Sequence, residues 1–254
     1  MINMKQALVL PVLVVMIAVL GFSAPNAMAV TSTVTDKISC EAPSVGGVWT
    51  VANNTCTVGT LVVGPADTLA IGQHVVFSIG TVTSSGVIQN NGTILIANSG
   101  GVITTSGTVT NNGVIANRGG TITNSGPFNN FGTMKSTGTI TNGPTGAITT
   151  SGMLSSTGVI TSSGSITINS HGVLVNLGGV LTNTLNIVNS GTIKTSGTFT
   201  NSGPVMNTGI IANKGLITNS NTITNSGNIV DFCGGSITNS GTIAVHTVIE
   251  QCVV

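Results

Sequence analysis

The chain has 254 residues, of which 40% are hydrophobic and only 4% are charged. An ordinary globular domain carries about 25% charged residues, so the polar surface of this chain must come from Ser, Thr and Asn. A net charge of +1, the absence of Tyr and the presence of one Trp argue against a nucleic-acid-binding surface, which needs basic and aromatic side chains. Apolar residues recur at regular intervals, which distinguishes the sequence from a disordered chain.

Residues 1–29 have the pattern of a signal peptide. Lys5 supplies the positive charge, residues 7–22 form the apolar segment, and Ala27-Met28-Ala29 matches the small-residue cleavage site. A retained membrane anchor is the alternative, although the apolar run is slightly short for about 30 Å of hydrocarbon. We expect cleavage after Ala29, which leaves a mature chain with five basic and five acidic residues that is secreted or held at the cell surface.

Residues 30–70 lack the repeat that follows, and we expect them to form an N-terminal cap. This segment contains Trp49 and the cysteine pair Cys40 and Cys56. Cysteines in an exported chain are typical of disulfide bonds, because the compartment outside the cell is oxidising.

Residues 71–241 consist of short units such as TVTSSG, VIQNNG, GTITNSG and, at 236–241, SITNSG. Each unit has a polar–apolar–polar alternation followed by Asn, Ser and Gly, which predicts a short strand with an inward apolar residue and then a corner. A fixed period of this kind indicates stacked units. No stretch after residue 30 has helical spacing.

Taking every third unit aligns one inward apolar column whose members are 18 to 21 residues apart. The column contains Val82, Ile103, Ile122, Ile140, Ile160, Leu181, Phe199, Ile217 and Ile237. Each member is followed by Thr, and this outward column contains Thr83, Thr104, Thr123, Thr141, Thr161, Thr182, Thr200, Thr218 and Thr238. The alignment predicts an all-β, three-faced parallel β-helix of about nine coils, roughly 43 Å long at ~4.8 Å per coil.

Asparagine recurs two residues after the inward apolar position, at Asn90, Asn111, Asn124, Asn142, Asn183, Asn201, Asn207, Asn219, Asn225 and Asn239. Stacked asparagines can hydrogen-bond from coil to coil, and Asn and Gly both tolerate the left-handed backbone that we expect at sharp corners. Gly-Gly pairs at 100–101, 119–120, 178–179 and 234–235 lengthen some corners.

Residues 242–254 lose the corner pattern, and we expect them to form a C-terminal cap strand. Cys233 and Cys252 lie at this end of the chain. Opposite ends of a rod of about 43 Å cannot be bridged by a disulfide, so the architecture predicts the pairs Cys40–Cys56 and Cys233–Cys252.

The GTITNSG-type units resemble the secreted right-handed β-helices of haemagglutinin-repeat adhesins and the β-strand-repeat surface proteins of bacteria and archaea, over residues 70–245. This resemblance implies right-handed coiling, export, and a surface, adhesive or matrix role. Left-handed hexapeptide helices are the alternative, but their units usually place a small residue where this chain has Thr, and the seven- and eight-residue units fit them poorly.

The repeat lacks the residues that catalysis requires. Between residues 68 and 230 there is no Asp or Glu, and the acids Asp36, Glu41, Asp67, Asp231 and Glu250 lie in or beside the expected caps. Polysaccharide lyases and hydrolases with this fold need such carboxylates. His74, His171 and His246 are far apart in the repeat, so we expect no metal site, no cofactor and no enzymatic activity.

Two outward faces are candidates for binding. Arg118, Lys135, Lys194 and Lys214 all fall in the third unit of a coil, so they share one face that suits an anionic glycan or lipid surface, or that simply deters lateral strand pairing. The Thr column resembles the surface of β-helical ice-binding proteins, although Thr is also a good outward strand residue.

The expected function is therefore that of a secreted, non-catalytic structural or adhesive rod. Its expected partners are cell-surface or matrix components, including glycans or other copies of the chain, and a membrane only through an uncleaved signal segment. Ice binding is the first alternative and polysaccharide processing the second. Asn53 and Asn91 begin N-glycosylation sequons, which arise easily by chance in a chain this rich in Asn, Ser and Thr.

Overall fold

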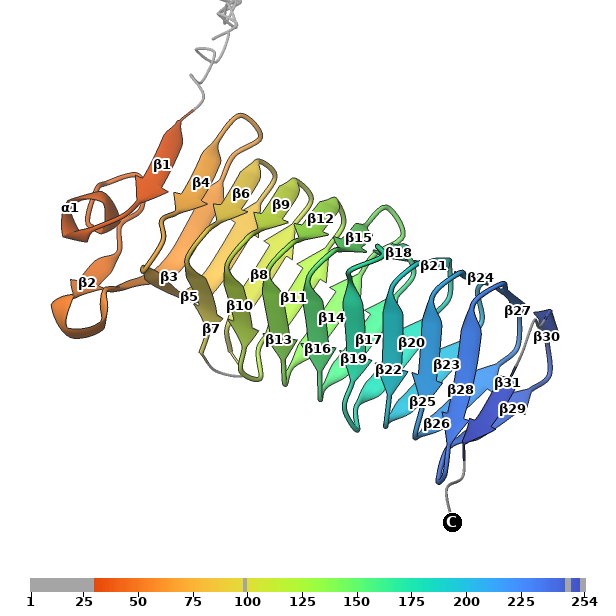
Figure 1. The fold of residues 1–254 in the computed structure, drawn as a ribbon. Coiled ribbons are helices and arrows are strands. Elements are labelled where there is room, and N and C mark those ends of the chain that lie inside the picture. The colour runs from red at the N-terminus through yellow and green to blue at the C-terminus, as the bar shows by residue number, and fades with distance from the viewer. Residues whose placement is uncertain (1–29, 98–99, 245–247, 252–254) are drawn as a thin grey trace, which may run out of the picture.

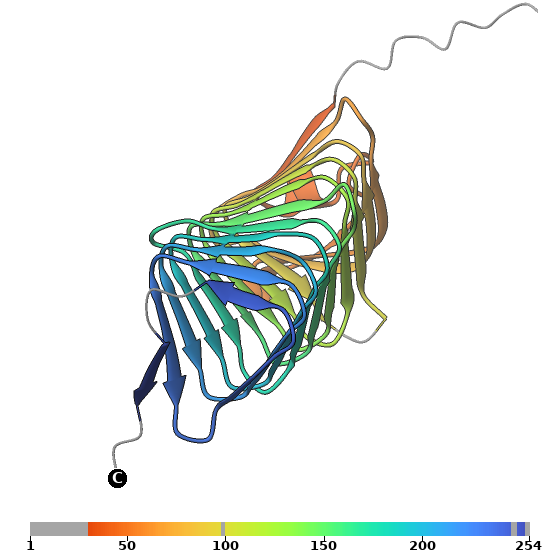
Figure 2. The same ribbon diagram turned by 90° about the vertical axis from the view of Figure 1, so that its right-hand side faces the viewer.

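The computed structural model describes residues 30–97, 100–244 and 248–251. Over these residues the chain is an all-β parallel solenoid of about ten turns. Figure 1 shows the coils following one another along a rod, and Figure 2 shows them stacked behind one another. The predicted fold class is confirmed.

Three strands in each coil define three faces, which we name A, B and C. Face A consists of β1 (Thr31–Val34), β4 (Thr68–Ile71), β6 (Val87–Asn90), β9 (Thr108–Asn111), β12 (Pro127–Asn130), β15 (Ala147–Thr150), β18 (Ser165–Ile168), β21 (Ile187–Asn189), β24 (Val205–Asn207), β27 (Thr222–Asn225) and β30 (Thr242–Ala244). Face B consists of β7 (Thr93–Ile96), β10 (Val114–Asn117), β13 (Thr133–Ser136), β16 (Met153–Ser156), β19 (Val173–Asn176), β22 (Thr192–Thr195), β25 (Ile210–Asn213), β28 (Asn228–Phe232) and β31 (Val248–Gln251). Face C consists of β8 (Val102–Thr105), β11 (Thr121–Asn124), β14 (Thr139–Asn142), β17 (Val159–Ser162), β20 (Val180–Asn183), β23 (Thr198–Asn201), β26 (Leu216–Asn219) and β29 (Ser236–Asn239).

Two longer strands join faces B and C. Both β3 (Thr55–Val63) and β5 (Val76–Ser84) pass from face B to face C, at Gly59 and Gly80 respectively. A Cβ on Gly80 would overlap the carbonyl oxygen of Gly59 in the coil below, so the chain needs glycine at this crossing. In later coils the face B strand ends at this corner, and the chain turns before the face C strand begins.

The core is a set of vertical columns, one behind each face. The predicted column from Val82 to Ile237 is confirmed, because each member pairs with the next in parallel register on face C. All of its members are buried except Ile237, which is half-buried. Burial of each aliphatic side chain contributes roughly 1.5–3 kcal/mol, and a coil gains it only when a neighbouring coil covers it.

The second inward residue of most strands is polar, and these residues form ladders along the rod. In each ladder the Nδ2 atom of one Asn donates to the side-chain oxygen of the residue one coil further toward the C-terminus, at 2.6–3.2 Å. The ladders are Asn90–Asn111–Asn130–Thr150 and Asn189–Asn207–Asn225 on face A, Asn117–Ser136, Asn176–Thr195 and Asn213–Asp231 on face B, and Asn124–Asn142–Ser162 and Asn183–Asn201–Asn219–Asn239 on face C. The predicted stacking of asparagine is therefore confirmed, and it involves more residues than the sequence indicated.

The predicted left-handed backbone of the corner asparagines is wrong. Among the described non-glycine residues, Asn54 and His74 have positive φ, and neither belongs to a ladder. Gly119, Gly178 and Gly234 have positive φ, as expected for Gly-Gly corners. Most other corner glycines are required for space instead: a Cβ on Gly132 would overlap the carbonyl oxygen of Gly113, one coil below.

The segments predicted as caps take part in the sheets. In the N-terminal segment, β1 pairs with β4 on face A, and β2 (Val48–Thr50) pairs antiparallel with β3. Two short helices lie between these strands, α1 (Lys37–Cys40) and the 3-10 helix η1 (Val51–Asn53), although the sequence showed no helical spacing there. At the other end, β30 and β31 continue faces A and B. No helix among the described residues is long and apolar enough to cross a membrane.

Candidate functional site

The Thr column lies on the outside of face C, in register over its whole predicted length. Consecutive members pair with one another from Thr83 to Thr238. Val62 continues the column by one coil at the N-terminal end and is 70% exposed. The column therefore presents methyl groups in every coil, accompanied by a hydroxyl group in every coil after the first, at a repeat of about 4.8 Å.

A second outward column on face C lies two residues before the Thr column, about 6.7 Å from it along the strands. It contains Thr60, Thr81, Val102, Thr121, Thr139, Val159, Val180, Thr198, Leu216 and Ser236. Its members are β-branched or hydroxyl-bearing except Leu216. Face C is thus an uncharged surface of methyl and hydroxyl groups in two parallel rows.

The basic residues lie on face B, as the sequence predicted. Lys135 and Lys194 belong to the central outward column, which runs Ala116, Lys135, Ser155, Val175, Lys194 and Ala212. Arg118 and Lys214 belong to the corner column, one position beyond the end of the strand, where each backbone N–H donates to the coil below. All four side chains are exposed.

The histidines are not brought together. His74 occupies a left-handed corner position with φ of 66°. His171 is exposed in a turn, with Nδ1 3.3 Å from Ser170 Oγ. His246 lies outside the described residues. Among the residues that are described, no group of three or more His, Cys, Asp or Glu side chains is arranged to hold a metal ion.

The carboxylates have structural roles near the two ends of the rod. Asp36 caps α1, and hydrogen bonds from the backbone and the side chain of Ser39 lower the pKa of its carboxyl. Asp231 ends one Asn ladder by accepting from Asn213 at 2.7 Å. Asp231 also lies in register with Glu250 on the neighbouring strand β31, so these two carboxylates occupy adjacent strands at the C-terminal end of the rod.

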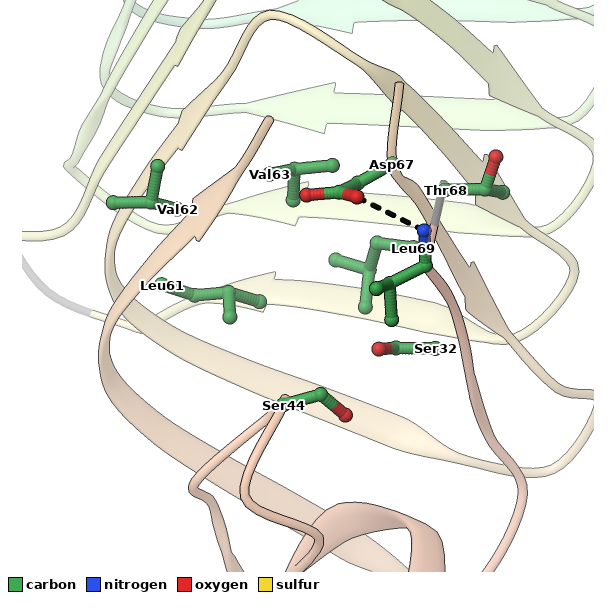
Figure 3. Close-up of a pocket in the computed structure, with 9 residues that line it drawn as sticks. Ser32, Ser44, Leu61, Val62, Val63, Asp67, Thr68 and Leu69 are labelled. Carbon is green, nitrogen blue, oxygen red and sulfur yellow. Dashed lines mark hydrogen bonds between the residues drawn. The ribbon is translucent and has the colours of Figure 1, made fainter. Parts of the chain in front are cut away.

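A hollow of about 190 Å³ lies at the N-terminal end of the rod, between β1, β3 and β4 (Figure 3). Leu61, Val63 and Leu69 form its apolar part. Asp67 lies at its edge, where Oδ1 accepts from the backbone N–H of Val30 and Oδ2 from that of Gly64, both at 3.0 Å. Asp67 thereby fastens β1 to the first coil, which is a structural role that the sequence did not indicate.

The disulfide Cys40–Cys56 is present, with a Cα–Cα distance of 5.7 Å. It ties α1 to β3, and Gly47 lies against both sulfur atoms. The predicted partner of Cys233, Cys252, lies outside the described residues. The sequon residues Asn53 and Asn91 are both exposed, and Asn91 accepts a hydrogen bond from Asn112 at 3.0 Å.

Two shallow hollows on face B were not predicted from the sequence. They lie between the central and corner columns, on either side of Leu177, which is 50% exposed. Arg118 and Lys135 line one hollow, and Lys194 and Lys214 line the other. The sequence signal was a large apolar residue at a corner position where the two neighbouring coils carry Thr157 and Ser196.

The chain matches no family model, no curated protein and no solved structure. The function must therefore be argued from the geometry of these faces.

Proposed function

We propose that the protein is a secreted, non-catalytic structural rod that adheres to cell-surface or matrix components through its long side faces. The observation that carries the proposal is the stack of about ten turns, which repeats outward positions at a fixed spacing along each face and, on face C, repeats Thr from Thr83 to Thr238. Such an array suits many weak contacts with a repetitive partner, whose affinities combine through multivalency.

Two further features support this proposal. The disulfide Cys40–Cys56 suits an oxidising compartment outside the cell. The absence of Asp and Glu between residues 68 and 230 leaves the strands from β4 to β27 without the carboxylates that glycan-cleaving enzymes use.

The experiment is to locate the chain by fractionating its source cells, and then to mix the purified oxidised protein with intact cells and matrix. We expect the protein in the surface or extracellular fraction, and we expect the purified protein to bind intact cells or matrix. Incubated with a panel of polysaccharides, it should release no product. Turnover of any of these polysaccharides, or a cytoplasmic chain with reduced Cys40 and Cys56, would overturn the proposal.

Ice binding is the second candidate, because the in-register Thr column on face C is a specific observation in its favour. The test replaces Thr123, Thr141 and Thr200 with Tyr and measures thermal hysteresis. A matched control replaces three outward threonines of face A, namely Thr110, Thr149 and Thr167. Hysteresis that is lost only in the face C variant would establish ice binding, and its absence from the unmodified protein would exclude it.

A further inference from the structure

The cations of face B form two dyads, each beside its own hollow. Arg118 and Lys135 come from adjacent coils beside one hollow, and Lys194 and Lys214 come from adjacent coils beside the other. The volumes of the hollows are about 420 and 310 Å³. We call these pairs the first and second dyads.

The spacing of the dyads follows from the register of face B. Arg118 follows β10 and Lys194 lies in β22, which is four coils further along the sheet. Lys135 in β13 and Lys214 after β25 are also four coils apart. The dyads are therefore about 19 Å apart along the rod.

No acidic side chain opposes this charge over most of the rod. Residues 68–230 contain no Asp or Glu, so no carboxylate lies among the coils of the first dyad or between the two dyads. The nearest acid in sequence to the second dyad is Asp231, whose Oδ1 atom accepts from the Asn213 amide. Lys214 lies 5.1 Å from the centre of the Phe232 ring, a cation–π contact that holds the ammonium group beside its hollow.

The low density of charge selects the kind of polyanion. Duplex DNA carries one negative charge per ~1.7 Å, and a surface with two cations every 19 Å or so would neutralise few of them. Binding to an anionic lipid surface is strengthened by about 1 kcal/mol for each basic residue that reaches it. The four cations here line hollows instead of forming one convex cluster, which suits a flat membrane poorly. A narrow linear chain with widely spaced carboxylates fits both the charge and the shape.

We propose that face B binds a linear acidic polysaccharide with widely spaced carboxylates, which runs along the rod and contacts both dyads. The proposal rests on the adhesive function above and names its partner. Because the dyads are fixed on one rigid stack, a chain that reaches both binds more tightly than one that reaches a single dyad.

The test uses hyaluronan, a linear polymer with one carboxylate per disaccharide, as the probe, and neutral dextran as its uncharged control. The binding of graded hyaluronan lengths to the full oxidised chain is measured at low and at physiological salt. We expect binding that weakens with salt and rises with length until an oligosaccharide spans both dyads. Replacing both members of one dyad with Gln should weaken long-chain binding roughly three- to tenfold.

The control is Lys37→Gln, which removes one positive charge from α1 in the N-terminal segment, outside both dyads. It should leave hyaluronan binding unchanged, and circular dichroism should show that all the variants keep the fold. Equal losses in Lys37→Gln and the dyad variants, or no hyaluronan binding at low salt, would overturn the proposal. So would tighter, dyad-dependent binding of single-stranded DNA or of phosphatidylserine vesicles.

Failure here is distinguishable from failure of the proposed function. If the protein binds intact cells but does not bind hyaluronan, the adhesive function is retained and only the proposal that face B binds an acidic polysaccharide is lost.

Discussion

Ile168 lies directly in register with Asn189, at a position where a ladder of polar side chains on face A is interrupted. Asn189 donates onward to Asn207, but its own buried Oδ1 has no hydrogen-bond partner among the described residues. The same is true of Asn90, Asn117, Asn124, Asn176 and Asn183, the first member of five other ladders. Because every ladder amide donates toward the C-terminus, these six ladders begin with an unused acceptor, a group that is costly to bury. In the seventh ladder, Oδ1 of Asn213 accepts from the backbone N–H of Gly215 at 3.0 Å.

The first prediction extends one of these ladders. Ile168→Asn places an amide that can donate to the unused Oδ1 of Asn189. The new hydrogen bond, which contributes about 1 kcal/mol and removes the cost of a buried unpaired acceptor, should offset part of the lost apolar burial. The matched control is Ile166→Asn, which puts the same amide among Ile148 and Ile187. Urea unfolding should show the control to be less stable by about 2 kcal/mol or more; equal losses would contradict the directional ladder.

The second prediction tests the core column of face C. Ile140 is fully buried between Ile122 and Ile160, so Ile140→Asp leaves an unpaired charge in the core and should cost about 3–5 kcal/mol. The adjacent outward substitution Thr141→Asp should cost much less, because its carboxylate can remain in water. Thermal melts monitored by circular dichroism compare the two, and near-wild-type melting of Ile140→Asp would refute the assigned core.

The third prediction concerns the corner glycines. A Cβ on Gly132 meets the carbonyl oxygen of Gly113, whereas a Cβ on Gly59 meets nothing within 4 Å. Gly132→Ala should therefore destabilise the fold by about 1–3 kcal/mol, because the coils must move apart. Gly59→Ala should change stability by less than about 0.5 kcal/mol. The free energies of unfolding in urea measure both, and equal effects would show that the stacked carbonyl is not the cause.

The fourth prediction separates the two ends of the rod. Replacing Cys40 and Cys56 with Ser opens a link across 16 residues and should cost about 3 kcal/mol. Trp49 pairs with Cys56 across β2 and β3, and its fluorescence should report unfolding of this end before the coils melt. Replacing Cys233 and Cys252 should leave the Trp49 transition in place and increase end-to-end association through exposed strand edges. A Trp49 transition that shifts equally in both variants would contradict separate ends.

Much of the fold could be predicted because the period is visible in single residues. In every third unit the inward apolar residue is followed by Thr, which indicated the grouping in threes, and the register confirms this column from Thr83 to Thr238. The interruption of the face A ladder at Ile168 could not be predicted from the sequence. Ile168 is an ordinary apolar strand residue, and only the register shows that it lies between Thr150 and Asn189. The left-handed backbone expected of the corner glycines did not reveal the steric role of Gly132, since the carbonyl that excludes a side chain belongs to Gly113 in another coil.

The face B hollows were harder still to predict. Each depends on the relative sizes of side chains in two columns, with Leu177 standing between them. The four basic residues could be placed on one face from the sequence, but their division into two dyads required the register of the coils.

The confinement of contacts to neighbouring coils has a consequence for how this rod can change in length. The segment TITN occurs at 121–124 and 139–142, one coil apart on face C, so successive coils are close to interchangeable as units. Removal of one whole coil joins strands that already share a register, and it shortens the rod by about 4.8 Å. Removal of a single strand residue instead turns inward side chains outward along that strand. Selection for a foldable product therefore permits rods whose lengths differ by whole coils.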